Sequence, residues 1–451
     1  MNKIYSDKNI LLVYPKYEET FWSFKTVLKM IGKKSAYPPL GLLTVGAMLP
    51  KKWGKKLIDM NCENLRDEDI KWADYVFISA MLIQRESSKD VIKKVQSFEK
   101  PVVAGGPLFT TNPEDFPEVD YFVLGEVEDT LQVFLDDLEK GSAKKIYVSE
   151  KFPDISKSPV PDWSLIDVSK YNSLSIQYSR GCPFNCEFCD VVRLNGRIPR
   201  YKSTEQLTNE LEALYDTGWR NGVFFVDDNF IGNKKNVKNE VLPAIIKWQK
   251  KRKRPFTFNT QTTINLADDK KLTKLMVEAG ITAVFIGIET PDNNSLKEAC
   301  KVQNVNKDLL QAIKKIQNAG MEVQAGFIVG FDNDGPSIFQ RQIDFIQKSG
   351  IATAMVSVLT ALPKTRLYER LLKTNRLTGE ASGNNTKSSE LNFIPTMGTE
   401  TLLKGHKQIL STIYSPKFYY ARVNTFLKQY RPMEGKRARL RLYHIKALFG
   451  S

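Results

Sequence analysis

The sequence predicts an α/β protein with two successive series of strands and helices and a basic, mostly helical C-terminal extension. Short apolar runs alternate with helical stretches over residues 1–150. Six further strand-like runs alternate with helices over residues 172–375, and a proline-containing stretch at 151–171 separates the two series. This alternation is typical of parallel sheets that are covered by helices.

Length and composition limit the classes of protein to consider. The chain has 451 residues, enough for two or three domains that each bury an apolar interior. With 42% hydrophobic and 26% charged residues it is neither disordered nor fibrous, and it has no apolar run of the ~18 residues that a membrane span needs. The five cysteines are an odd number, which fits thiols or metal ligands in a reducing compartment. We therefore expect a cytoplasmic protein.

The first series predicts a Rossmann-like domain over residues 1–150, with the strands ILLVYP, KKLIDM, DYVFISAM, KPVVAGG and DYFVLGE. In a parallel sheet, the loops that follow the strands gather at the carboxyl edge, where such sheets bind cofactors. Gly105 and Gly106 fall in one of these loops, where missing side chains would admit a nucleotide-like tail to the backbone. A glycine pair alone favours an ordinary tight turn over a cofactor contact. The linker KFPDISKSPVPDWSLID then closes the domain.

The second series predicts an open, partial (β/α)6 barrel over residues 172–375. Its strands are SLSIQYS, GVFFVDD, FTFNTQT, AVFIGIE, EVQAGFIVGF and TAMVSVLTAL. Six units are too few for a closed barrel of eight strands, and functional residues in barrels of this kind lie at the carboxyl ends of the strands. The loop that follows the first strand should therefore lie at the functional mouth.

That loop, YSRGCPFNCEFCDVV, contains Cys182, Cys186 and Cys189 in a C-x3-C-x2-C spacing. A structural zinc site needs four ligands, and the only histidines, His406 and His444, are too far along the chain to complete a local site. A four-iron, four-sulfur cluster held by three thiolates leaves one iron open to a small molecule. The spacing therefore favours a [4Fe-4S] cluster whose open iron binds S-adenosylmethionine (SAM), as radical chemistry with SAM requires.

The motif CPFNCEFC resembles that of the radical SAM enzymes, and other segments of the barrel agree with this resemblance. It implies that VDD, GIETP and GFIVGF, each at the end of a strand, contact SAM. Capping of the next helix is the alternative role for the two aspartates of VDD, and a plain core strand is the alternative for the glycines of GFIVGF. The SAM-binding residues implied by the resemblance are Phe188, Asp227, Asp228, Glu289, Gly326 and Gly330.

The order of the segments resembles the cobalamin-binding branch of the radical SAM family. LIDMNCENLRDEDIKWADYVFISAMLIQRES, FVDDNFIGNKKNVK and FYYARVNTFLKQYRP resemble the hopanoid methylases and bacteriochlorophyllide methyltransferases. The resemblance implies a B12-binding-type domain at 1–150, a linker at 151–171, a radical SAM barrel at 172–375 and a C-terminal extension at 376–451. It also implies cobalamin-dependent methylation of an unactivated carbon.

Cobalamin, if bound, is expected without a histidine ligand from the N-terminal domain. No histidine precedes His406, so the D-x-H-x-x-G motif that many cobalamin domains use is absent. The residues expected next to the corrin are Met81, Gln84, Gly105 and Gly106. For Gln84, the sequence favours a hydrogen bond at the protein surface over contact with the corrin.

Other functions and partners stay open at this point. Methylthiotransferases that modify RNA are expected to carry a second cysteine cluster, whereas Cys62 is the only cysteine of the first domain, so we do not expect a nucleic acid partner. Ring closure, oxidation or carbon–carbon bond formation without methyl transfer is a closer alternative, and a cluster-binding module without turnover is a more distant one. By analogy, the substrate is a small lipid-like or tetrapyrrole molecule and the reductant a flavodoxin or ferredoxin. Residues 401–451 carry eleven Lys or Arg and one Glu, which suits contact with a membrane surface.

Overall fold

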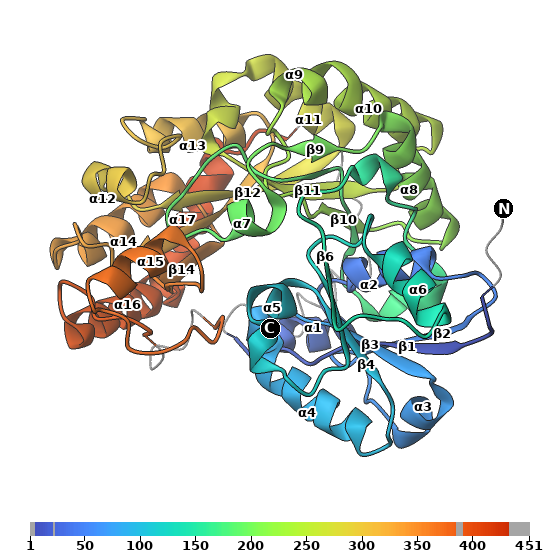
Figure 1. Cartoon of the computed structure of the whole chain (residues 1–451). Coiled ribbons are helices and arrows are strands. Elements are labelled where there is room, and N and C mark those ends of the chain that lie inside the picture. The colour runs from blue at the N-terminus through green and yellow to red at the C-terminus, as the bar shows by residue number, and fades with distance from the viewer. Residues whose placement is uncertain (1–4, 21–22, 385–390, 433–451) are drawn as a thin grey trace. The chain divides into compact units, whose positions relative to one another are not determined.

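The computed structural model describes residues 5–20, 23–384 and 391–432, and these residues form two compact units (Figure 1). The first unit comprises residues 5–20 and 23–176 together with 200–219. The second comprises residues 177–199 and the described residues from 220 to 432. This division follows compactness alone, so the boundaries predicted at residues 150, 171 and 375 stay predictions.

The first unit contains a six-stranded parallel sheet with the strand order β2-β1-β3-β4-β5-β6. Strand β1 pairs with both β2 and β3, so the direction of winding reverses there, and in open sheets of this class the reversal is the usual place for a ligand. The strands are β1 Asn9–Tyr14, β2 Gly54–Asp59, β3 Tyr75–Ser79, β4 Val102–Gly105, β5 Tyr121–Leu124 and β6 Ile146–Val148. The helices are α1 Lys25–Met30, α2 Leu40–Met48, α3 Asp67–Trp72, α4 Arg85–Gln96, α5 Pro107–Thr111, α6 Leu131–Glu139 and, later in the chain, α8 Thr204–Asp216.

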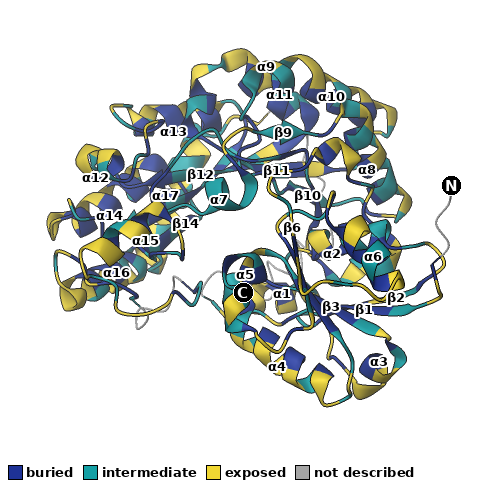
Figure 2. Cartoon of the chain, in the orientation of Figure 1, coloured by how far each residue is buried: buried dark blue, intermediate teal, exposed yellow. Residues whose placement is uncertain are grey.

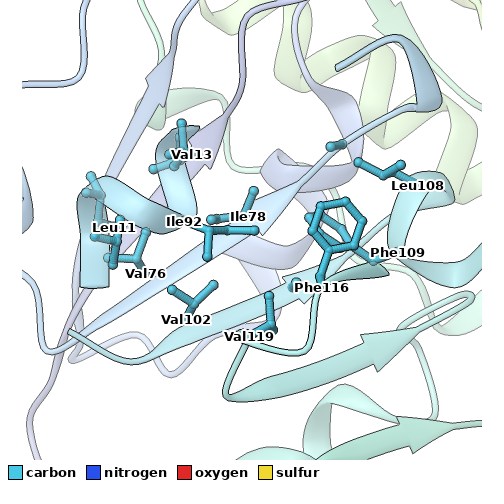
Figure 3. Packing of buried hydrophobic residues seen from close by; sticks show 14 of the residues in the cluster. Leu11, Val13, Val76, Ile78, Ile92, Val102, Leu108, Phe109, Phe116 and Val119 are labelled. Carbon is cyan, nitrogen blue, oxygen red and sulfur yellow. The ribbon is translucent and has the colours of Figure 1, made fainter. Parts of the chain in front are cut away.

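The core of this unit lies between the sheet and its covering helices (Figure 3). The four central residues of β1, from Ile10 to Val13, are all fully buried, so helices cover both faces of the strand. Phe109 of α5 packs edge to face against Phe116, with 4.8 Å between ring centroids. The continuous apolar runs that predicted parallel strands therefore reflect burial on both faces of the sheet.

The second sheet has the order β14-β13-β12-β11-β10-β7, which follows the sequence and confirms the predicted open barrel of six strands. Its strands are β7 Leu174–Ile176, β10 Gly222–Phe225, β11 Thr257–Thr262, β12 Ile281–Glu289, β13 Glu322–Val329 and β14 Ala354–Val358. The main helices are α10 Leu242–Lys251, α11 Lys270–Ala279, α13 Leu309–Asn318 and α14 Ser337–Ser349. Three shorter helices are α7 Val191–Asn195, α9 Lys234–Asn236 and α12 Asn293–Glu298, and two short strands, β8 Ser179–Arg180 and β9 Arg200–Tyr201, lie outside this sheet.

Residues of β13 alternate strictly between buried and half-buried, so the two faces of this sheet differ. The buried face packs under the outer helices, whose far sides carry exposed residues (Figure 2). The half-buried face is the inner face of the barrel. The sheet therefore leaves one face for function.

Three C-terminal helices complete the second unit: α15 Arg366–Lys373, α16 Thr399–Ile413 and α17 Pro416–Gln429. Helix α17 packs on α13 and α14, outside the barrel. Its fully buried Arg422 donates to the Oε1 atom of Gln347 and the carbonyl of Ile413, both at 2.7 Å. The described part of the extension is therefore fastened to the outer helices. The basic stretch GKRARLRLYHIKALFG lies outside the described residues, and no helix within the described ranges is long and apolar enough to cross a membrane.

Candidate functional site

The cysteine loop begins directly after β8 with a glycine that its geometry requires. Gly181 has φ +97°, and a Cβ atom there would lie 2.9 Å from the carbonyl oxygen of Asn195. The backbone N–H of Cys182 donates to the carbonyl of Gly196 at 3.1 Å, which closes the loop on itself. The three thiols therefore belong to one compact turn.

Asp227 and Asp228, which follow β10, bind this turn through their carboxylates. Asp228 accepts hydrogen bonds from the N–H of Gly181 at 2.8 Å and from the Nδ2 atom of Asn195 at 3.0 Å, so it holds both ends of the loop. The fully buried Asp227 accepts from the N–H groups of Tyr178 at 3.1 Å and Ser179 at 2.5 Å. Burial raises the pKa of Asp227 to about 7. Because both carboxylates already bind the chain, their predicted contact with SAM stays a prediction.

The three thiols are partly or fully buried and lie near a positive charge. Cys186 is buried, whereas Cys182 and Cys189 are half-buried. Burial raises the pKa of each thiol, to about 12 for Cys189, while the positive charge of Lys301 acts in the opposite direction on all three. Among the residues that the structure describes, no three His, Cys, Asp or Glu side chains meet around a point where a single metal ion would fit.

Lys301 forms a buried ion pair with Glu289, a residue that the sequence predicted for the site. The ammonium of Lys301 donates to the Oε1 atom of Glu289 at 2.6 Å, and both residues are less than a tenth exposed. Glu289 ends β12 with φ +66°, a conformation that costs about 1–3 kcal/mol outside glycine. A Cβ atom on Gly287 would lie 2.6 Å from the Nζ atom of Lys301, so this glycine makes room for the pair. The fold thus maintains a strained, charged arrangement beside the thiols.

Two amides follow in the same segment: Gln303 contacts the cysteine loop, and Asn304 donates to the carbonyls of Gly287 and Ile288 near the end of β12, both at 3.0 Å. The Nε2 atom of Gln303 donates to the Sγ atom of Cys186 at 3.8 Å. The Oε1 atom of Gln303 and the Oδ1 atom of Asn304 are buried and accept no hydrogen bond within the described structure. Buried acceptors of this kind require a donor, and the ammonium group of SAM is such a donor. The residues therefore fit a cluster with SAM next to it.

Lys301, Gln303 and Asn304 are not among the site residues predicted from the sequence. They lie more than a hundred residues after the cysteines, and only the fold of the segment behind β12 brings Lys301 and Gln303 to the loop and Asn304 to the end of β12. The available signal was the polar pattern K-x-Q-N soon after a strand that ends in glutamate.

The remaining residues predicted for SAM take different places. Gly326 pairs in register with Gly287, so two neighbouring strands lack side chains on the inner face at this level. Gly330 has φ +109° and forms a turn whose N–H donates to Asp334 at 2.9 Å. The ring of Phe188 packs on Phe331, with 6.2 Å between centroids. The SAM contacts of these residues stay predictions.

The candidate cobalamin residues lie in the first unit. Met81 follows β3 at the reversal of strand order and is 52% exposed. Gln84 is fully buried, accepts from the N–H of Met81 at 2.7 Å and donates to the carbonyl of Pro15 at 2.5 Å. The alternative of a surface hydrogen bond for Gln84 is therefore wrong, because its amide fixes two loops from inside.

Gly105 and Gly106 form the tight turn after β4. A Cβ atom on Gly105 would lie 2.7 Å from the carbonyl oxygen of Val123, and one on Gly106, at φ +85°, would lie 2.5 Å from the Oγ atom of Ser79. The turn therefore needs both glycines for its own packing. Contact of these glycines, of Met81 or of Gln84 with cobalamin stays a prediction.

Comparisons with known families place both cofactor domains on the chain. Residues 176–346 match the radical SAM superfamily, residues 33–135 the B12 binding domain, and residues 365–451 a domain of unknown function, DUF4070. The fold resembles the cobalamin-dependent SAM radical enzyme OxsB, solved with aqua-cobalamin and SAM, with a TM-score of 0.71 at 17% identity over 94% of this chain and 72% of that one. It also resembles the radical SAM methyltransferase TsrM of Kitasatospora setae, with a TM-score of 0.63 at 14% identity over 83% of this chain and 79% of that one.

Two relatives in sequence cover most of both chains. An uncharacterized methyltransferase of Synechocystis is 42% identical over 93% of this chain and 78% of its own length. The hopanoid C-2 methylase of Rhodopseudomonas palustris is 34% identical over 91% of this chain and 78% of its own length. The chain therefore belongs to the cobalamin-binding radical SAM methyltransferases, whose cofactors are a [4Fe-4S] cluster, SAM and cobalamin.

Proposed function

We propose that this chain methylates an unactivated carbon of a small, weakly polar molecule, with a lipid-like polycycle as the first candidate. The observation that carries the proposal is the group formed by the Lys301–Glu289 ion pair and the unpaired acceptors of Gln303 and Asn304, next to a loop of three thiols. When bound, the cluster and SAM supply a radical that abstracts hydrogen, and cobalamin supplies the methyl group.

The chain's own residues would bind and orient these groups. Cys182, Cys186 and Cys189 are proposed as the cluster ligands. The oxygens of Gln303 and Asn304 suit the ammonium end of SAM, and the cation of Lys301 suits an anionic group close to the thiols. Asp227 and Asp228 stabilise the cysteine loop by accepting hydrogen bonds from its backbone. Holding the reacting groups in one geometry and away from water is the protein's main contribution to such chemistry.

The inner face of the barrel supports a weakly polar substrate. Beyond the first residue of β13, the half-buried side chains of β10 to β14 are neutral, and they combine apolar groups with amides and one hydroxyl. They are Phe224, Asn259, Gln261, Ala283, Phe285, Gln324, Ile328, Met355 and Ser357. A face of this composition suits burial of a rigid apolar body with a few directional hydrogen bonds.

The names of relatives give the two substrate classes to test. One relative is a hopanoid C-2 methylase, and a more distant one, 24% identical, is the bacteriochlorophyllide d C-12(1)-methyltransferase of Chlorobaculum tepidum. We propose a flavodoxin or ferredoxin as the electron donor. We also propose that the enzyme works in the cytoplasm at a membrane surface, because residues 401–451 carry a net charge of +10 and a lipid substrate resides in a membrane.

The proposal is tested with enzyme that is reconstituted anaerobically with iron, sulfide and hydroxocobalamin. The enzyme is incubated with SAM labelled in the methyl group, a reductant and either polycyclic triterpenes or tetrapyrroles, and products are identified by mass spectrometry. Transfer of the label to a triterpene carbon, absent in Cys186→Ala, supports the proposal. Transfer of the label to a tetrapyrrole and not to a triterpene would contradict the lipid-like substrate and assign a tetrapyrrole instead. Release of 5′-deoxyadenosine with modified but unmethylated substrate would contradict methyl transfer.

A further inference from the structure

Helix α15, the first helix of the segment that matches a domain of unknown function, reaches back to the cysteine loop. Arg370 of this helix donates from Nε to the Oε1 atom of Glu187 at 2.7 Å and from Nη2 to Oε2 at 3.1 Å. Glu187 stands between Cys186 and Phe188 in the motif and is only 8% exposed. The helix therefore forms a bidentate ion pair with Glu187, the residue next to the proposed cluster ligand Cys186.

Backbone hydrogen bonds attach the same residue on both sides. The N–H of Leu367 in α15 donates to the carbonyl of Glu187 at 3.0 Å, and the N–H of Glu187 donates to the carbonyl of Ala299 at 2.9 Å. Arg366 also reaches the carbonyl of Asn185, at 3.3 Å. The middle of the cysteine loop is thus hydrogen-bonded to α15 on one side and to the segment that follows α12 on the other.

Apolar packing supports this attachment. Phe188, which precedes the third cysteine, packs on a buried cluster from α15 and the barrel ends that includes Leu367, Leu371 and Phe331. Burial of an aromatic side chain in such a cluster contributes to stability over and above the ion pair. The loop is therefore held by charge, backbone and apolar contacts from one helix.

Arg370 also connects the loop to the ends of the barrel strands. Its Nη1 atom donates to Asp332 at 2.5 Å and its Nη2 atom to Glu298 at 3.3 Å. Asp332 follows β13, and Glu298 ends α12, which follows β12. The guanidinium of Arg370 thus connects the cysteine loop to the segment after β13 and to the end of α12.

We propose that α15 is a clamp that holds the cysteine loop in its cluster-binding conformation, with Arg370 as the positioning residue that acts through Glu187. This inference rests on the proposed cluster ligands, and it assigns a role to the start of the C-terminal segment. A loop held from outside pays less conformational entropy when its three thiolates are gathered around a cluster. The clamp should therefore slow the loss of the cluster.

The test compares Arg370→Met with Arg376→Met in the full-length, anaerobically reconstituted protein. Arg376 is a matched control, because it binds Asp332 with Nη1 and Nη2 at 2.9 and 2.7 Å and, within the described residues, forms no hydrogen bond with the cysteine loop. Cluster loss to an iron chelator is followed by absorbance, and the reduced cluster is examined by electron paramagnetic resonance with and without SAM.

In Arg370→Met, the chelator should remove the cluster roughly three- to tenfold faster than in wild type, and the spectrum should broaden. Arg370→Lys keeps the positive charge but cannot form the bidentate pair, so its rate of cluster loss should lie between those of wild type and Arg370→Met. Arg376→Met should lose its cluster at the wild-type rate. The double variant Glu187→Met/Arg370→Met should be no faster than either single variant, because both remove the same contact.

Equal rates in Arg370→Met and Arg376→Met, or additive effects of Glu187→Met and Arg370→Met, would overturn the clamp. If Arg370→Met does not fold, Glu187→Gln gives the same comparison, because it weakens the pair while the guanidinium remains. Failure of wild type to take up any cluster would instead refute the proposed function, so the two failures are distinguishable.

Discussion

The ion pair between Lys301 and Glu289 gives the sharpest prediction for stability. The side chains of these residues are only 11% and 7% exposed, so Lys301→Met would leave a buried carboxylate without its cation. Removing one partner of a buried pair costs about 3–5 kcal/mol, mostly because the remaining charge stays desolvated. In a domain of this size, this corresponds to a fall in melting temperature of roughly 6–20 °C.

The assay is thermal unfolding of the cluster-free protein by circular dichroism, with wild type and two variants. Lys301→Met alone should show the full loss, and Lys301→Met/Glu289→Gln should recover at least half of it, because the second change removes the stranded charge. A loss below about 1 kcal/mol in Lys301→Met would contradict this prediction, since it would mean that Glu289 finds another partner or water. A double variant less stable than Lys301→Met would do the same.

Three further predictions concern the thiols, the loop and the dependence on pH. Cys62→Ala and Cys300→Ala should retain cluster and SAM cleavage in iron analysis and product assays, whereas both should be lost on alanine substitution of Cys182, Cys186 or Cys189. Gly181→Ala should lower the iron content and cost about 1–3 kcal/mol in thermal unfolding, because its φ of +97° and the carbonyl of Asn195 leave no room for a methyl group; wild-type iron content would contradict this. Burial raises the pKa of Asp334 from 3.8 to about 6. A raised carboxyl pKa stabilises the folded protein below the unfolded value, and this contribution is lost as the pH rises through the folded value. The stability of wild type relative to Asp334→Asn should therefore fall by up to about 3 kcal/mol between pH 4 and pH 6, and a pH-independent difference would contradict the assignment.

Much of the fold could be predicted because its signals are local. Runs such as ILLVYP predicted parallel strands, and β1 is indeed buried on both faces. The six barrel strands follow one another in sequence order, so their neighbours in the sheet could be inferred from the chain itself. The cysteine spacing likewise lies within a single loop, and its chemistry can be read without the fold.

The parts that could not be predicted depend on contacts between distant residues. Gln303 meets Cys186 across 117 positions and Arg370 meets Glu187 across 183, and neither approach leaves a periodic pattern in one sequence. Gln84 looked like a surface residue because amides usually are, yet two backbone partners satisfy it in the interior. The acids after β10 could be placed near the cysteines, but their use as braces for the loop required the three-dimensional structure.

Membership of this family means that one chain binds both an iron–sulfur cluster and cobalamin. The most direct measurement is anaerobic reconstitution with iron, sulfide and hydroxocobalamin, followed by desalting and quantification of iron and cobalt in the same sample as an absorbance spectrum. We expect about four irons and one cobalt per chain, with the iron lost in Cys186→Ala and the cobalt retained. Iron without cobalt would contradict the cobalamin-dependent account, and cobalt without iron in the wild-type chain would contradict the assignment of the three cysteines.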